Sequence, residues 1–317
     1  MANSFRNEFV RWSARATTAT ALGLCLAASF AALGSPTEET PPPRNFTFFV
    51  ASDSHFGARN MSEVNRTLVQ QMNELPGTEY PPLLGGKVDV PRVVLFTGDT
   101  TDNGTLEEFA EFENVYGLTG KEGLLRYPVF ETIGNHDVNA DSPIKARAAE
   151  RHGAINYALD WEDVRLLCLD MYPDATTLRW LQAQLKQAGR TRPLVLFFHY
   201  SLEGNYSDFW EQSEKDDFAQ AILGYNVLAI FHGHEHWMGH YVWRGKPVFR
   251  PGAPRHPHHY FLAVRMGPRE MSVAAWDFDN RRWADAWMVP IRRQPSSAAR
   301  PAAGSGRRPP ATSPARP

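Results

Sequence analysis

Three histidines stand at alternate positions in the stretch VLAIFHGHEHWMGH, residues 227–240. They are His232, His234 and His236, and they follow directly on an apolar run. Histidine is the commonest nitrogen ligand for metals, and alternate residues of an extended chain point to the same face. Two or more of these rings could therefore bind one metal cluster. The alternative is a chance enrichment of histidine in a surface loop, and the rest of the chain has to decide between them.

Four earlier apolar runs also end in residues that bind metals. FTFFVASD, RVVLFTGD, YPVFETIGNH and PLVLFFHY have the length and content of buried strands. In open α/β sheets, ligands gather beyond the carboxyl ends of the strands, where loops converge. The polar residues at the five ends are Asp53 and His55, Asp99, Asn135 and His136, His199, and His234 with His236. Each alone has an ordinary structural explanation, such as a cap or a core histidine, but their coincidence at five strand ends predicts one metal site.

These blocks, in this order, resemble the calcineurin-like metallophosphoesterase family. The motifs that carry the resemblance are DSH at Asp53, GDTTDNG at Gly98, GNHD at Gly134, the lone histidine of FFHY at His199, and GHEH at Gly233. The resemblance covers roughly residues 45–292. It implies an α/β fold, a four-layer α-β-β-α sandwich of two mixed β-sheets, with a site for two metal ions.

The resemblance also implies which residues would hold each metal. By motif position, one metal would take Asp53, His55 and His236, the other Asn135, His199 and His234, and Asp99 would bridge them. This mixture of carboxylate, amide and imidazole ligands fits Mn, Zn, Fe, Ni or Co better than Ca or Mg. Paired metals can lower the pKa of a bound water toward about 7, so a hydroxide would attack phosphorus without a protein nucleophile.

His136 is not expected to bind metal. It resembles the family's histidine that faces the substrate and protonates, or hydrogen-bonds to, the departing oxygen, and with Asn135 it is predicted to bind the substrate. Asp102 lies three residues after Asp99, as does the carboxylate that orients this histidine in the phosphoprotein phosphatases of the superfamily. The alternative is that Asp102 caps a turn or helix ahead of GTLEEF.

Two departures from related patterns bear on the substrate. The protein serine/threonine phosphatases read GNHE and GDxVDRG where this chain reads GNHD and GDTTDNG, and Asn103 stands where their phosphate-gripping arginine would be. FFHY followed by SLEGN also lacks the second histidine and the prolines common in cyclic-nucleotide phosphodiesterases. We therefore predict a metal-dependent hydrolase of small phosphomonoesters or phosphodiesters. Its alternatives are a cyclic-nucleotide or phospholipid-head-group phosphodiesterase and, from another class, a non-catalytic metal- or phosphate-binding module.

Other residues near these motifs are open to two interpretations. Aromatic side chains beside the ligand loops would form an apolar wall for an organic leaving group, or would simply pack; they are Tyr206, Trp210 and Trp237. His232 is expected to pack inside its strand. The remaining histidines would line the pocket, hold an extra metal or lie in a polar loop; they are His240, His256, His258 and His259.

Helices and hairpins must position the strand ends. Apolar spacing predicts helices over Ser62–Leu75 and Thr177–Ala188, with a further helix starting at Ser213. After His236 the pattern changes to hairpins that turn at Arg244-Gly245 and at Gly267-Pro268. An α/β half followed by a more antiparallel half predicts two sheets that share a core.

The two ends of the chain differ in composition from its middle. Residues 1–34 combine a basic leader with an apolar stretch, which predicts a cleaved secretory signal or, alternatively, a retained membrane anchor. Residues 35–44 are interpreted as a linker, 45–292 as the metallophosphoesterase domain, and 293–317 as a disordered tail rich in Pro, Ala and Arg. We accordingly expect an exported protein, periplasmic or extracellular.

The overall composition is that of an ordinary globular protein, with 43% hydrophobic and 21% charged residues among 317. The 33 basic and 35 acidic residues give a net charge of −2, so no global field recruits nucleic acid or an anionic membrane. A small phosphate ester is the expected partner, because metals can supply local positive charge. If Cys25 leaves with the signal, Cys168 stays as a single thiol, predicted to be buried and inert within VRLLCLDMY.

Overall fold

The structure, a computed structural model, describes residues 44–138, 142–255 and 259–291. The predicted signal or anchor, the predicted tail, nearly all of the predicted linker, and both His256 and His258 lie outside the described residues. Within those three ranges, no helix is both long enough and apolar enough to cross a membrane.

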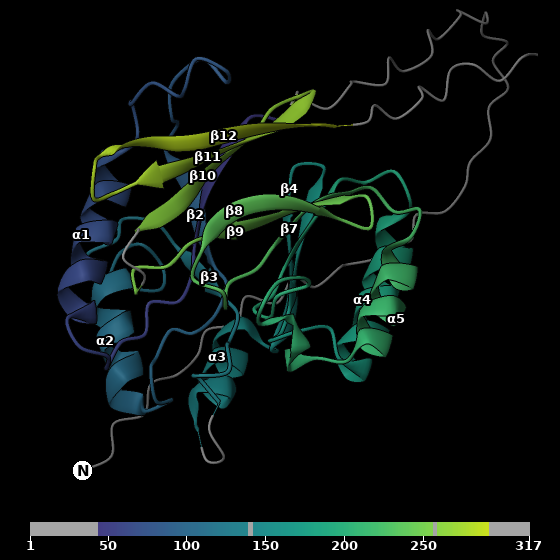
Figure 1. Cartoon of the computed structure of the whole chain (residues 1–317), viewed down its shortest axis with the longest axis horizontal. Coiled ribbons are helices and arrows are strands. Elements are labelled where there is room, and N and C mark those ends of the chain that lie inside the picture. Colours follow the sequence, from purple (N-terminus) through teal and green to yellow (C-terminus); the bar gives the residue numbers. More distant parts are fainter. Residues whose placement is uncertain (1–43, 139–141, 256–258, 292–317) are drawn as a thin grey trace, which may run out of the picture. The chain divides into compact units, whose positions relative to one another are not determined.

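The described chain forms two mixed sheets of six strands each (Figure 1). The first has the order β12-β11-β10-β1-β2-β3 and is built of β1 (Phe46–Ala51), β2 (Pro91–Phe96), β3 (Val129–Glu131), β10 (Tyr260–Met266), β11 (Glu270–Asp277) and β12 (Arg282–Pro290). In it, β1, β2 and β3 are parallel, whereas β10 is antiparallel to β1. The predicted α/β strands and the later hairpin strands therefore share one sheet.

The second sheet repeats this mixture of parallel and antiparallel pairs. It has the order β4-β5-β6-β7-β9-β8 and contains β4 (Asn156–Trp161), β5 (Val164–Leu169), β6 (Leu194–Phe197), β7 (Val227–Phe231), β8 (Met238–Trp243) and β9 (Lys246–Pro251). Parallel pairing joins β5, β6, β7 and β9, while β4 and β8 are antiparallel edge strands. The β8–β9 and β10–β11 hairpins turn where the sequence predicted.

Helices cover the outer face of each sheet (Figure 1). α1 (Met61–Glu74) and α2 (Leu106–Tyr116) pack on the first sheet, and α4 (Ala175–Ala188) and α5 (Gln212–Ile222) pack on the second. A shorter helix, α3 (Ile144–His152), and a 3-10 turn, η1 (Ser207–Phe209), connect strands. Three of these helices match the predicted ones to within about two residues, whereas α2 and α3 were not predicted.

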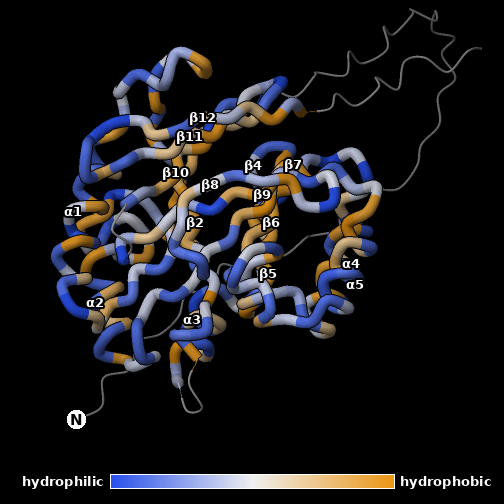
Figure 2. Tube along the Cα trace, viewed as in Figure 1, coloured by the Kyte–Doolittle hydropathy of each residue, from blue (hydrophilic) through white to orange (hydrophobic). Residues whose placement is uncertain are grey.

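The side chains of single strands show why four layers form. In β1, Phe49 contacts the helix-side core, whereas Phe48 and Val50 point into the core between the sheets. In β6, Leu196 packs toward α4 and α5, whereas Phe197 points to the first sheet. Successive residues of a strand face opposite sides, and strands such as β6 and β7 are apolar along their length (Figure 2). The predicted α-β-β-α sandwich is confirmed.

Candidate metal centre

The predicted ligands come from strand ends of both sheets. The loops after β1, β2 and β3 of the first sheet and those after β6 and β7 of the second carry them. The site therefore straddles the two sheets, whereas the sequence pattern placed the ligands only at strand ends. Close packing of the sheets through the central core is what brings these loops together.

One group of metal-type side chains lies mainly around the loops after β1 and β7. Single ligand atoms of Asp53, His55, Asp99 and His236 lie within 4.8 Å of one another. Nε2 of His55 is 3.1 Å from Nε2 of His236, which in turn lies 3.5 Å from Oδ1 of Asp53. Two imidazole nitrogens and a carboxylate oxygen thus converge on one small volume, the arrangement that a cation requires.

A second group shares Asp99 with the first. Ligand atoms of Asp99, His199 and His234 also lie within 4.8 Å of one another, and Oδ1 of Asn135 is 3.1 Å from Nε2 of His199. Oδ1 of Asp99 accepts the backbone N–H of His136, whereas Oδ2 lies 3.6 Å from Nε2 of His55 and 3.3 Å from Nε2 of His199. One oxygen of Asp99 is thus oriented toward both groups.

Hydrogen bonds on the far side of the rings leave the inward nitrogens available. Nδ1 of His199 is 2.8 Å from the backbone oxygen of Thr97, so in the neutral ring Nδ1 carries the proton and Nε2 the lone pair. Nδ1 of His55 lies 3.2 Å from Oδ1 of Asp102, and in the tautomer in which it donates to that oxygen Nε2 likewise carries the lone pair. Nε2 of His234 is buried and has no hydrogen-bond partner among the described residues. Such an orphaned nitrogen fits a metal ligand, because buried polar atoms are otherwise paired.

The protonation of the rings reflects their burial and the charge of two buried carboxylates. Burial lowers the pKa of His55 and of His234 to about 4, which keeps both rings neutral, as metal binding requires. Burial also opposes charge on His199, but the carboxylates of Asp99 and Asp53 outweigh it and raise its pKa to about 9. Since Asp53 and Asp99 are almost wholly buried, the centre attracts positive charge, and the donor set fits two metal ions.

The backbone at the ligands is in a conformation that side chains rarely adopt. Ten non-glycine residues in the described ranges have positive φ, and five of them are predicted ligands: Asp53, His55, Asp99, His234 and His236. Their φ values lie between 43° and 74°. Such backbone costs of order 1 kcal/mol or more per residue and gathers at functional sites. The folded scaffold thus holds these side chains against a local preference.

Asp137 joins two ligand loops, a role that the sequence interpretation missed. Its buried carboxylate accepts hydrogen bonds from the backbone and hydroxyl groups of Thr100 and Thr101 and from the backbone of Gly134. The loop after β2 is thereby fixed to the loop after β3. Asp137 is the final residue of the GNHD motif, but the sequence does not indicate which groups it binds, because Thr100 and Thr101 lie in another loop.

His136 lies beside the two groups and lines the adjoining cleft. Its Nδ1 is 2.7 Å from the backbone oxygen of Asp102, whereas the carboxylate of Asp102 is 3.8 Å away. That carboxylate lies closer to His55 and to Arg255. Helix α2 takes Thr105 as its N-cap, so Asp102 does not serve as the cap of that helix.

The cleft over the site has a volume of about 480 Å³ and an aromatic rim. Tyr206, Phe209 and Trp237 line it and are each about half exposed. Phe209, which the sequence interpretation missed, packs edge-on to His234 with ring centroids 4.3 Å apart. Trp210, by contrast, is buried against the second sheet.

Three further histidines among the described residues have structural contacts. His232 is fully buried, as predicted, and its Nε2 is 2.7 Å from the hydroxyl of Tyr241. His240 packs against Phe249, and His259 pairs with Asp279 at 2.8 Å.

Comparison with known proteins places these motifs in a family. Residues 46–238 match the calcineurin-like phosphoesterase family. A glycerophosphodiester phosphodiesterase GpdQ from Enterobacter lignolyticus is 28% identical over 170 residues, which are 47% of this chain and 54% of that protein. A probable glycerophosphodiester phosphodiesterase GpdQ from Arcobacter nitrofigilis is 26% identical over 183 residues, 52% and 64% of the two chains. The chain thus spans between half and two thirds of these relatives.

Solved structures with the same fold are more distant in sequence. A dimetal phosphatase from Danio rerio has a TM-score of 0.56 at 13% identity, covering 78% of this chain and 99% of that one. GAP50, described as the anchor in the inner membrane complex of Plasmodium, has a TM-score of 0.59 at 9% identity, covering 79% and 90%. At these identities the likeness concerns the fold.

Proposed function

The chain belongs to the calcineurin-like phosphoesterase family, a family of hydrolases acting on phosphoester bonds, and on this premise we propose that it hydrolyses small organic phosphodiesters with two bound metal ions. The observation that carries the proposal is the pair of ligand groups that share Asp99 beneath an open cleft. His136, exposed in that cleft, supplies a proton donor beside them.

The side chains that would hold the metals are those predicted from the motifs. One ion would take Asp53, His55 and His236, the other would take Asn135, His199 and His234, and Asp99 would serve both. When bound, such ions would offset charge on the phosphoryl oxygens and lower the pKa of water toward about 7.

The chain's own residues would orient the substrate and move one proton. Asn135 and His136 line the cleft next to both groups and would contact the ester. With Nδ1 bound to the backbone oxygen of Asp102, a protonated His136 presents its Nε2–H to the departing oxygen. No serine is required as nucleophile, since Ser54 donates to the backbone of Thr100 and Ser201 is buried.

Two observations favour a diester over a monoester. The curated relatives are named for glycerophosphodiesters. The cleft is open and has an aromatic rim, which can accept an organic group in addition to the phosphoryl group. A phospholipid head group and a cyclic nucleotide also contain a phosphodiester bond. Both are therefore alternative substrates to be distinguished by experiment.

The test compares a bis(p-nitrophenyl) phosphate with p-nitrophenyl phosphate, using the full chain loaded with Mn or Zn. A glycerophosphodiester and a cyclic nucleotide are assayed in parallel. We expect turnover of the diesters, with the bis-ester preferred over the monoester. If a protein that binds two metals turns over none of these esters, the proposal that the chain is an enzyme is wrong. A preference for the monoester would contradict the assignment as a diesterase.

Export is part of the proposal and rests on residues 1–34, with their basic leader and apolar stretch. Mass spectrometry of the mature protein from its native host should find an N-terminus near residue 35. An intact N-terminus in a membrane fraction would instead support a retained anchor.

A further inference from the structure

Arg255 is an arginine at the metal centre that no motif contains. It follows β9, and its Nη1 lies 2.6 Å from Oδ1 of Asp102 and 2.8 Å from Nδ1 of His55. The side chain is 37% exposed and lines the cleft together with Asn135 and His136. Among the described residues that line this cleft, it is the only arginine or lysine.

The guanidinium stands where a third cation would otherwise fit. Ligand atoms of His55, Asp102 and His136 lie within 4.8 Å of one another, a geometry that could hold a metal ion. Nη1 of Arg255 already contacts two of these three residues. Oδ1 of Asp102 faces Nη1 of Arg255 as well as Nδ1 of His55, so these two nitrogens lie side by side. A permanent positive charge is thus built into this corner of the site.

The contacts of Arg255 leave part of its donor fork for a ligand. A guanidinium has five N–H donors in a plane that matches phosphate oxygens, and both contacts with described residues use Nη1. Asn103 does not take this role, because its side-chain amide donates to Glu108 at 2.8 Å and carries no charge. The positively charged side chain in the cleft is therefore Arg255 from the loop after β9, and the loop after β2, which carries Asn103, supplies none.

We propose that Arg255 binds a non-bridging oxygen of the substrate's phosphoryl group, while Asp102 holds its guanidinium in place. The inference rests on the proposed function, since it names the residue that holds the phosphoryl group in that same cleft. The competing role is purely positioning: Arg255 would fix Asp102, and through it His55, without touching the substrate.

The test uses Arg255→Ala and Arg255→Lys in the full chain, with inorganic phosphate as the probe. We expect the alanine variant to bind phosphate about ten- to a hundredfold more weakly and to lose a similar factor in kcat/KM through KM. It should keep the wild-type metal content and metal affinity. Lysine should restore part of the binding, because it returns the charge but not the planar fork.

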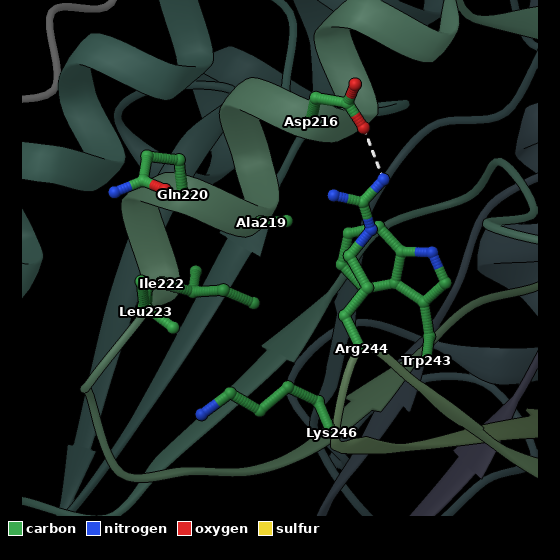
Figure 3. Close-up of a pocket in the computed structure, with 8 residues that line it drawn as sticks. All are labelled: Asp216, Ala219, Gln220, Ile222, Leu223, Trp243, Arg244 and Lys246. Carbon is green, nitrogen blue, oxygen red and sulfur yellow. Dashed lines mark hydrogen bonds and ion pairs between the residues drawn. The ribbon is translucent and has the colours of Figure 1, made fainter.

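Arg244→Ala is the matched control for removing one positive charge. Arg244 pairs with Asp216 beside a separate surface pocket between α5 and the β8–β9 hairpin (Figure 3). Its removal should change neither phosphate binding nor turnover. An equal loss of phosphate affinity in this variant would show that the effect is general electrostatics and would overturn the proposal.

Asp102→Asn separates the two roles of Arg255. If Arg255 only positions His55, then Arg255→Ala and Asp102→Asn should both weaken metal binding, and both should recover phosphate affinity at saturating metal. That outcome would overturn the proposal. Because phosphate and metal titrations need no turnover, they test Arg255 even if the ester assays rule out the proposed function.

Discussion

At the scale of single residues, His136 differs from the proposed ligands His55 and His199 in its exposure, because the side chains of those two ligands are fully buried. The inward nitrogens of His55 and His199 face carboxylates, whereas His136 is 37% exposed and its Nδ1 is 2.7 Å from a backbone oxygen. A backbone carbonyl cannot be changed by substitution of its side chain. The carboxylate of Asp102 lies 3.8 Å from the same nitrogen of His136 and is closer to Arg255 and His55, so its predicted role in orienting His136 stays a prediction.

We predict that His136→Ala keeps both metals but loses proton transfer. A positioned acid contributes about 10²- to 10⁴-fold, and most when the departing oxygen is basic. An alkyl ester should therefore slow by about that factor, and a p-nitrophenyl ester much less. His199→Ala is the control, and it should lose metal and slow both esters alike. Metal analysis beside the two rates is the measurement; equal slowing of both esters in the His136 variant would contradict the assigned role.

At the scale of elements, the turn after β2 allows the ligand loops to approach each other closely. Gly98 has φ of +95°, and a Cβ there would lie 2.7 Å from Nδ1 of His199 and 2.9 Å from the backbone nitrogen of Gly134. Gly77 has a nearly equal φ of +91°, with nothing within 4 Å of such a Cβ. An alanine at either position would therefore strain the backbone, but only the alanine at Gly98 would also clash with neighbouring atoms.

We predict that Gly77→Ala costs about 1–3 kcal/mol of unfolding free energy, since only the backbone is strained. Gly98→Ala should cost more and should also lower metal affinity, because it displaces His199 or the loop that carries Asn135. Urea denaturation of both variants, with a metal titration of each, provides the measurement. Equal destabilisation with unchanged metal affinity would show that the loops can relax around the extra methyl group.

The turn before α5 carries two of the three aromatic residues of the rim, Tyr206 and Phe209, and is itself anchored. Trp210 is buried and donates its Nε1–H to the backbone oxygen of Ser201 at 2.8 Å, and Lys215 donates to the backbone oxygen of Ser207. Tyr206 and Phe209 are thereby held over His234, with ring centroids 5.9 Å and 4.3 Å from its own. These rings offer a surface on which the planar ring of an aryl ester can stack.

We predict that Phe209→Ala raises KM for p-nitrophenyl esters about two- to tenfold, the range expected for one aromatic contact. KM for a methyl ester should change less, because a methyl group has no ring to stack. Leu223→Ala, which removes an exposed apolar side chain on the surface pocket beside α5, is the control and should change neither. A similar rise in KM for both esters would show that Phe209 acts by supporting His234.

The sequence predicted the features that local chemistry encodes. Apolar runs ending in Asp, Asn or His specify both the strand and its ligand, so the strands β1, β2, β3, β6 and β7 were predicted together with the residues after them. The contacts of Arg255 and the hydrogen bonds from Thr100 and Thr101 to Asp137 could not be predicted, because these partners lie more than 30 residues apart in the sequence. Helix α2 was missed although its Thr105 and Glu108 form a capping box. The membership of each strand in one of two sheets depends on packing that no local pattern encodes.

At the scale of the whole molecule, the two sheets meet in one apolar core, and Cys168 of β5 lies inside it. The thiol is fully buried, and burial raises its pKa from an ordinary value near 9 to about 12. The folded-state pKa lies above the unfolded one, so this thiol contributes stability that is present below about pH 9 and is lost as the pH rises toward 12. At pH 8 the sheets must separate before an alkylating reagent can reach it.

We predict that alkylation of Cys168 measures the opening of this core and that metals slow it. The carboxylates of Asp53 and Asp99 lie where the sheets meet, so ions that bind only the folded state lower the population of open molecules. At a metal concentration of a hundred times Kd, each occupied site adds about 2.7 kcal/mol, so one bound ion slows alkylation about a hundredfold. A full chain carrying Cys25→Ser restricts the reaction to Cys168, and mass spectrometry follows it with metal and with chelator. The same rate under both conditions would mean that the core opens independently of the metal centre, and fast alkylation of the metal-loaded protein would mean that Cys168 is accessible without separation of the sheets.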